Sequence, residues 1–214
     1  MRRRNLESMG LREVLWAVML ASFLALGCVG GRSGSATPTQ EEQAEAQLAF
    51  EQATAALGAG RYNDAVPFLY DVLEADPTHT LARYNLGVAL QRLRQWKEST
   101  EVLTARRGRG VACRELSAGV QVPQDADADY VHALGTAFQE MRHDDAALAC
   151  FDAAIDLDSR HLKSRYARAL TLQLRGDLPA ARAAWRDYIG RDPHSSWGES
   201  AREHLAEVES QLSQ

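Results

Sequence analysis

The 214-residue sequence lacks the short motifs that carry most enzyme and metal chemistry. It has no GxSxG, P-loop or GxGxxG segment, which argues against the common hydrolase, nucleotide and dinucleotide sites. Its six histidines include no HExxH spacing, and no CxxC pair accompanies them, so zinc or haem binding is not expected. The sequence therefore predicts a protein that is not an enzyme and that needs no metal or cofactor.

Three alternating acids, Asp125, Asp127 and Asp129, resemble the start of a calcium-binding loop. Tyr130 stands where such a loop needs glycine, and Thr136 stands where it needs a bidentate acid. We expect these acids to cap the helix that follows them, because carboxylates bind free backbone N–H groups and complement the helix dipole.

Positive charge is scarce once the first 27 residues are set aside. After Gly27 the chain keeps 20 basic and 27 acidic residues, a net charge of −7, because four arginines and two glutamates precede that point. No Lys/Arg-rich block with interleaved aromatic residues occurs. Such an acidic surface repels phosphate, so we expect protein partners and no nucleic acid.

Residues 1–27 have the composition of an export signal. Three arginines at positions 2–4 precede the apolar run 14–27, which only Ser22 interrupts. A bilayer span takes about 20 residues, so this run has the length of a secretory signal core instead. It ends in LALGC at 24–28, which resembles the lipobox of bacterial lipoproteins. The resemblance implies that 1–27 is a signal peptide and that Cys28 carries fatty acyl chains such as palmitate.

Ala25 and Leu26 depart from the most usual lipobox residues, and ordinary signal cleavage and an uncleaved anchor are the alternatives. Residues 28–38 are rich in Gly, Ser and Thr and lack an apolar pattern, which predicts a flexible tether. In lipoproteins of this type an Asp after the cysteine often marks inner-membrane retention, and Val29 stands there. We therefore expect a lipid-anchored envelope protein at the periplasmic side of the outer membrane.

The rest of the chain repeats itself with a period of 34 residues, from starts at Ala46, Thr80, Ala128 and Leu162. The eighth and twentieth positions of each repeat are small, the twenty-fourth is large, and the eleventh is apolar. The eighth positions are Ala53, Gly87, Gly135 and Ala169, and the twentieth positions are Ala65, Ser99, Ala147 and Ala181. The twenty-fourth positions are Leu69, Leu103, Phe151 and Trp185, and the eleventh positions are Ala56, Leu90, Phe138 and Leu172. Small residues where two helices cross, with large ones beside them, predict stacked helical hairpins.

This pattern resembles the tetratricopeptide repeat, and the segments 84–87 and 133–138 look like its first helices. The resemblance covers 44–194 apart from one insertion. It implies an all-α fold, a right-handed α-solenoid of four such helix hairpins with a C-terminal capping helix, spanning 39–214. The repeats lie near 46–79, 80–113, 128–161 and 162–195. The usual Trp of the fourth position is absent, and another α-hairpin repeat or a plain helical bundle is the alternative.

Two pairs of residues have the spacing of a capping box, which satisfies free backbone N–H groups at a helix start. They are Thr39 with Glu42 and Ser196 with Glu199. The helix 196–212 carries apolar residues on one face and polar residues elsewhere, so we expect it to cover the last repeat and to be solvated outside.

The insertion 114–127 contains Gly119 and Pro123, which break the helical pattern and predict a loop or a short helix. A tolerated surface excursion and a segment that shapes the binding groove are both open. With Cys28 assigned to lipid, Cys113 and Cys150 remain as an even pair, and a disulfide between them is one interpretation. The other is that Cys150 packs as a small apolar side chain.

The resemblance also implies a binding surface, because ligand contacts in this family come mainly from the second, fifth, ninth, twelfth and thirteenth positions of the first helices. The candidate groove residues for a protein or peptide partner are Phe50, Tyr84, Gln91, Arg92, His132, Gln139, Lys163, Tyr166 and Gln173. The second and thirteenth positions also bring Gln47, Leu81, Asp129, Gly58, Glu140 and Leu174. Phe50 and Thr54 replace the Lys and Asn of the clamp that grips a terminal carboxylate, so that ligand class is not expected.

Two roles fit a lipid-anchored interaction module. One is a scaffold or assembly factor for an envelope complex, and the other is a pilotin-like factor that helps an outer-membrane secretin of type IV pili to assemble. A deletion strain distinguishes the two roles, because secretin multimers should be lost only if the protein is the pilotin-like factor.

Overall fold

The computed structural model describes residues 39–104 and 113–214, and the segment from Pro38 to Gln214 is one compact unit. The predicted signal peptide 1–27, the tether 28–38 and the lipidation site Cys28 lie outside the described residues.

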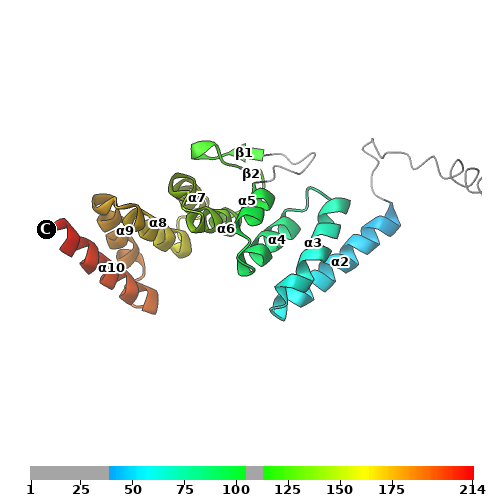
Figure 1. The fold of residues 1–214 in the computed structure, drawn as a ribbon, viewed down its shortest axis with the longest axis horizontal. Helices are drawn as coiled ribbons and strands as arrows, with labels where there is room; N and C mark the ends of the chain where they lie inside the picture. The colour runs from blue at the N-terminus through cyan, green and yellow to red at the C-terminus, as the bar shows by residue number, and fades with distance from the viewer. Residues whose placement is uncertain (1–38, 105–112) are drawn as a thin grey trace, which may run out of the picture. The chain divides into compact units, whose positions relative to one another are not determined.

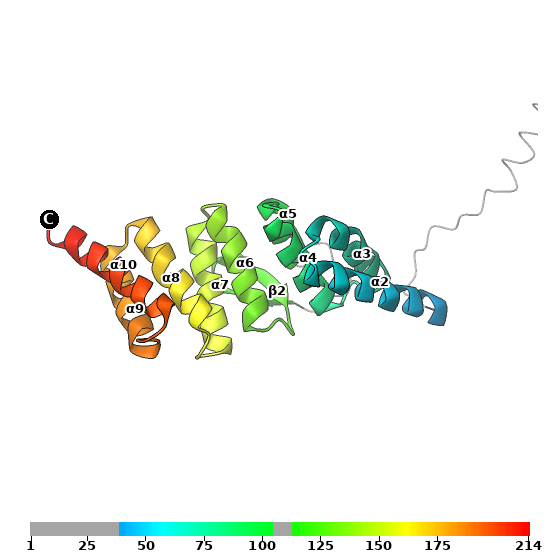
Figure 2. The same ribbon diagram turned by 90° about the horizontal axis from the view of Figure 1, so that it is seen from below.

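Eight helices pair into four hairpins, and α10 (Ser196–Leu212) follows them. The pairs are α2 (Gln40–Gly58) with α3 (Tyr62–Ala75), α4 (Thr80–Arg92) with α5 (Trp96–Leu103), α6 (Ala128–Glu140) with α7 (Asp144–Leu157), and α8 (Leu162–Arg175) with α9 (Leu178–Arg191). Each helix packs against the next along the chain, and the first helices α4, α6 and α8 also contact one another in order (Figures 1 and 2). This succession of hairpins is an α-solenoid.

The small and large positions of the repeat meet inside each hairpin, as the sequence predicts. All residues at the eighth and twentieth positions are buried, and Leu69, Leu103, Phe151 and Trp185 at the twenty-fourth are 0% exposed. A Cβ atom on Gly87 would lie 2.5 Å from Leu103 Cδ2, and one on Gly135 would lie 2.6 Å from Phe151 Cε1. The missing side chain at these two glycines is what allows the paired helices to approach closely.

Helices α4, α6 and α8 begin at Thr80, Ala128 and Leu162, the residues taken as repeat starts. Helix α2 begins at Gln40, six residues before Ala46. The reason is the capping box at Thr39, whose side chain accepts from the Glu42 backbone N at 3.2 Å while the Glu42 carboxylate accepts from the Thr39 backbone N at 2.9 Å. These two bonds satisfy N–H groups that have no partner within the first turn of a helix.

Helix α10 occupies the place of a fifth first helix. Its Ser200 and Glu207 are hydrogen-bonded to Tyr166 and Gln173, each 34 residues earlier in the chain. The cap is Ser195, which accepts from the Gly198 backbone N at 3.1 Å, so the predicted capping role of Ser196 is wrong by one residue. Glu203, at the eighth position, is exposed, and this charge in place of a small residue lets α10 end the stack in solvent.

The insertion forms a short antiparallel hairpin, where a loop or a short helix was expected. Strands β1 (Cys113–Glu115) and β2 (Gln121–Pro123) flank a single 3-10 turn, Ser117–Gly119, which packs against α7 (Figure 1). Val122 is fully buried in the cluster that also holds Val131 and Leu134. Strand β2 has only three residues, of which Gln121 is exposed and Val122 and Pro123 are buried. A segment this short shows no period of two, so hydrophobic periodicity does not predict it.

Candidate partner-binding surface

The candidate groove residues separate into two groups according to whether they contact the next repeat. The twelfth positions of the last three repeats all reach forward by one repeat. Gln91 Nε2 donates to the Ala133 carbonyl oxygen at 2.7 Å, Gln139 Nε2 donates to Thr171 Oγ1 at 2.9 Å, and Gln173 Nε2 donates to Glu207 Oε2 at 3.0 Å. These glutamines join neighbouring first helices to each other, and their amide donors are therefore occupied within the fold.

The fifth positions make a second row of contacts between repeats. The ring of Phe50 lies 4.9 Å from that of His79, and the ring of Tyr84 lies 6.2 Å from that of Tyr130, measured between centroids. His132 Nδ1 lies 3.0 Å from Ser164 Oγ. Phe50 also lines a small cavity of about 160 Å³. These side chains are partly buried, so they offer a partner less surface than the repeat positions alone suggest.

Tyr166 lies in a cluster of aromatic rings at the junction with α10. Its ring centroid is 4.9 Å from that of Trp185, 5.3 Å from Tyr188, 4.8 Å from Trp197 and 6.2 Å from His204. Its hydroxyl lies 3.0 Å from Ser200 Oγ. Edge-to-face ring pairs of this kind stabilise packed interfaces, so Tyr166 holds the capping helix in place.

The second and thirteenth positions of the first helices form a row along the repeats that is mostly open to solvent. These residues are Gln47, Leu81, Asp129 and Lys163, then Gly58, Arg92, Glu140 and Leu174. The two positions are eleven residues apart, about three turns of a helix with about 3.6 residues per turn, so they lie on one side of each first helix. Leu81 is 54% exposed and Leu174 is 52% exposed. We call these eight residues the first-helix face.

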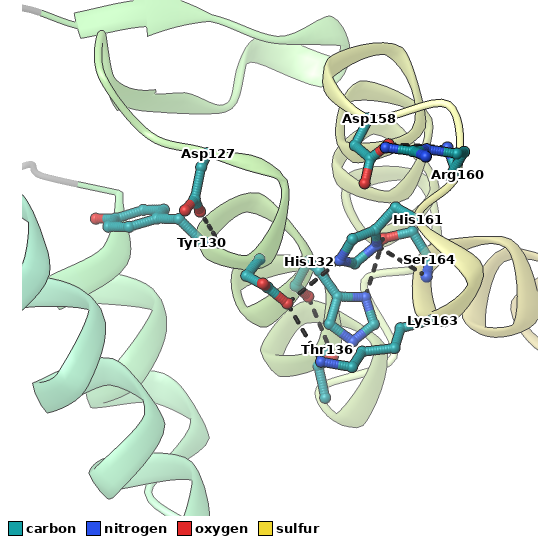
Figure 3. A network of polar contacts seen from close by, with 10 residues as sticks. Asp127, Tyr130, His132, Thr136, Asp158, Arg160, His161, Lys163 and Ser164 are labelled. Atoms are coloured by element: carbon teal, nitrogen blue, oxygen red, sulfur yellow. Dashed lines mark hydrogen bonds and ion pairs between the residues drawn. The ribbon is translucent and has the colours of Figure 1, made fainter.

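A polar network joins the third repeat to the fourth beside this face (Figure 3). His161 Nε2 lies 3.3 Å from Asp129 Oδ1, and Lys163 Nζ donates to the same oxygen at 3.3 Å. His161 Nδ1 lies 2.8 Å from Ser164 Oγ and also accepts from the Ser164 backbone N. His161 therefore caps α8 while contacting α6. Desolvation raises the pKa of the Asp129 carboxyl, but the hydrogen bonds and charges of His161 and Lys163 outweigh it, so the pKa of Asp129 is lowered on balance.

Asp129, His161 and Ser164 are connected in the same sequence of contacts as the acid, histidine and serine of a hydrolytic triad. Here these contacts join two packed helices. Ser164 is 0% exposed, and its Oγ is shared between two imidazoles, so a substrate cannot reach it. Burial, helped by the nearby His161 and Lys163 charges, lowers the pKa of His132 to about 4. His132 is therefore neutral at neutral pH, and it does not offer a partner the cation that its position suggests.

Three further groups were assigned roles from the sequence. Asp127 accepts from the Tyr130 backbone N at 2.8 Å and so caps α6, as predicted, while Asp125 accepts from Thr80 Oγ1. Cys150 is fully buried, and burial raises the pKa of its thiol to about 12. It packs as an apolar side chain among the residues of the third repeat. The side chain of Cys113 lies outside the described residues, so a disulfide between the two cysteines stays a prediction.

The repeats match a known family directly. The sequence model of the tetratricopeptide repeat matches residues 56–116 and residues 132–196. The chain belongs to the tetratricopeptide-repeat family. No curated protein sequence matches it.

Solved structures of tetratricopeptide-repeat proteins share the fold. YrrB, described as a TPR protein with an unusual peptide-binding site, superposes with a TM-score of 0.64 at 19% identity over 81% of each chain. MamA superposes with a TM-score of 0.61 at 17% identity over 79% of this chain and 88% of its own. MamA from Desulfovibrio magneticus RS-1 covers 88% of this chain and 99% of its own, with a TM-score of 0.58 and 18% identity.

Within 39–104 and 113–214, the tetratricopeptide-repeat fold gathers no group of three His, Cys, Asp or Glu side chains that would hold a metal ion. No helix in the same two segments is both long enough and apolar enough to cross a bilayer. The residues that sequence reasoning missed are His161, Ser164, Ser200 and Glu207. The 34-residue spacing from Tyr166 and Gln173 would have found the last two, because α10 continues the repeat register.

Proposed function

We propose that the protein is a non-catalytic interaction module that binds another polypeptide on its first-helix face and serves as a scaffold or assembly factor for an envelope complex. The observation that carries the proposal is the recurrence of solvent-exposed residues at the same two positions of four successive first helices. Helices α4, α6 and α8 contact one another in order, and the glutamines at their twelfth positions keep neighbouring helices fixed. Pre-organised surfaces bind with a smaller entropy cost.

The chemistry of the face suits a partner segment with both apolar and charged residues. Leu81 and Leu174 supply apolar area, and Arg92, Lys163 and Glu140 supply charge. The ion pair between Lys163 and Asp129 spans 3.3 Å with side chains 72% and 52% exposed. An exposed pair of this kind contributes little stability, so both groups are available to exchange partners.

Replacing Leu81 and Leu174 together by aspartate is expected to abolish capture of the natural partner from detergent-solubilised envelopes, because it removes the apolar contacts and adds charge that must be desolvated. The matched control replaces Leu157 and Leu212, which are 44% and 38% exposed on α7 and α10, in the same way. Quantitative mass spectrometry of the captured proteins measures the effect. Equal capture by the two variants would place the partner on another surface.

The anchor is a second part of the proposal, and it rests on the sequence 24–28. Replacing Cys28 by alanine should release the protein from the membrane fraction and remove the palmitate label, because diacyl or triacyl anchoring holds firmly where one chain is marginal. Lipidation would be contradicted if the Cys28→Ala variant stayed in the membrane fraction and the wild-type protein took up no palmitate label.

A further inference from the structure

Two equivalent grooves lie between successive second helices, away from the first-helix face. The groove between α3 and α5 has a volume of about 300 Å³ and is lined by Tyr70, Pro77 and Arg83. The groove between α7 and α9 also has a volume of about 300 Å³ and is lined by Arg165 and Asp187. Arg83 and Arg165 both occupy the fourth position of their repeats, so the two grooves can be compared residue by residue.

The charges in the α7–α9 groove neutralise one another. Arg165 Nη1 lies 2.7 Å from Asp187 Oδ2, and Arg168 Nε lies 2.5 Å from Asp152 Oδ1. Each arginine has a carboxylate partner from a neighbouring helix. This groove is therefore complete without a ligand.

The α3–α5 groove is not balanced in this way. Arg83 is 5% exposed and donates to the carbonyl oxygens of Val102 at 3.2 Å and Pro77 at 2.5 Å, and it has no carboxylate partner among the described residues. Glu74 and Glu98 line the groove and have no ion-pair partner within the described part of the chain. The guanidinium of Arg83 is satisfied by backbone carbonyls, so the carboxylates of Glu74 and Glu98 are left for another cation.

An aromatic ring completes the site. Tyr70 stands where the α7–α9 groove has Asp152, since both are the twenty-fifth residue of their repeats, and it is 45% exposed. An aromatic face attracts the cation of Arg or Lys, and carboxylates strengthen that attraction through charge-assisted hydrogen bonds. The half-buried side chains of Leu73, Pro77 and Val102 also line this groove. An apolar floor with an acidic rim is complementary to a long basic side chain, whose aliphatic stem packs on apolar surface while its charge stays at the rim.

We propose that the α3–α5 groove binds a basic segment of a partner protein, with an Arg or Lys side chain lying on Tyr70 and its charge facing Glu74 and Glu98. The site is separate from the first-helix face, so the protein would hold two polypeptide segments on two surfaces. A scaffold gains from this arrangement, because two modest contacts on one rigid body increase the effective concentration of each partner.

The test is fluorescence anisotropy with the compact unit, residues 39–214, and a short labelled peptide in which arginine and leucine alternate. The matched probe carries citrulline in place of arginine, which keeps the side-chain length and removes the charge. We expect binding of the arginine peptide only. The double variant Glu74→Gln/Glu98→Gln should weaken it about fivefold, and Tyr70→Leu about threefold, as exposed ion pairs and cation–π contacts typically contribute.

The control Glu199→Gln/Glu203→Gln makes the same charge change on α10, where both residues are exposed. Binding that both double variants weaken equally would be general attraction to an acidic protein and would contradict the proposal, as would equal binding of the citrulline peptide. Binding that appears only after Arg106, Arg107 and Arg109 are replaced by glutamine would assign the groove to the chain's own segment and would also overturn it. Circular dichroism of each variant confirms that the helices remain folded.

Discussion

Replacing Gly135 by leucine is expected to lower the free energy of unfolding by about 1–3 kcal/mol, the usual cost of overpacking a filled interior. The first atom of any side chain at this position would lie 2.6 Å from Phe151 Cε1 and 3.0 Å from Cys150 Cβ. Both neighbours are 0% exposed, so neither can move into solvent to make room. The helices α6 and α7 would have to separate, and the third repeat would lose its tightest contact.

Gly190 provides a matched control, because it is also a helical glycine but has nothing within 4 Å of the place that a Cβ atom would take. Leucine there should change stability by less than about 1 kcal/mol, since Gly190 is the next-to-last residue of α9 and has open space around it, and the full helix-propensity difference of about 1 kcal/mol is the upper bound. Urea denaturation followed by circular dichroism measures both variants. A Gly135→Leu protein as stable as the Gly190→Leu protein would show that the assigned repeat register is wrong.

Replacing Tyr166 by alanine is expected to cost about 2–4 kcal/mol, a little less than the loss of a fully buried aromatic side chain. The ring contacts Trp185, Tyr188, Trp197 and His204, and the cavity left behind would loosen α10 from α8 and α9. Because a solenoid is stabilised mainly by contacts between neighbours, the C-terminal hairpin and its cap should unfold first.

Tyr70→Ala is the comparison for this prediction, since Tyr70 is 45% exposed and its loss should change stability by less than about 1 kcal/mol. Thermal unfolding of both variants separates the two cases. If the Tyr166 variant had the same thermal midpoint as the Tyr70 variant, Tyr166 would not stabilise the junction with α10, and it would again be a candidate for partner binding, as the sequence predicts.

The repeat architecture follows from the sequence because each of its determinants is local. Gly87 and Gly135 permit close helix crossing, and Leu103 and Phe151 fill the space beside them, so a fixed spacing of small and large residues specifies the hairpin. Thr39 with Glu42 likewise indicates the start of α2 within four residues of sequence. These patterns can be recognised in the sequence without knowing which repeats contact one another.

The side chains that remain open to a partner are harder to predict, because contacts with the neighbouring repeat occupy some of the candidate groove residues. Gln91 and Tyr166 stand at positions that bind ligands elsewhere in the family, but here they contact Ala133 and the rings around α10 instead. The hairpin β1–β2 was missed for a related reason. Its strongest determinant is burial of Val122 against the third repeat, a contact that sequence periodicity does not report.

The most direct test of the account is photocrosslinking in intact envelopes, with a photoreactive amino acid at Leu81 or Leu174 on the first-helix face, both exposed. Controls carry it at Leu157 on α7 and Glu203 on α10, which are also exposed but lie elsewhere. We expect one shared protein adduct from Leu81 and Leu174 and none of that adduct from the controls. The same adduct from Leu157 or Glu203, with none from Leu81 and Leu174, would contradict the claim that the first-helix face is the surface that binds the partner.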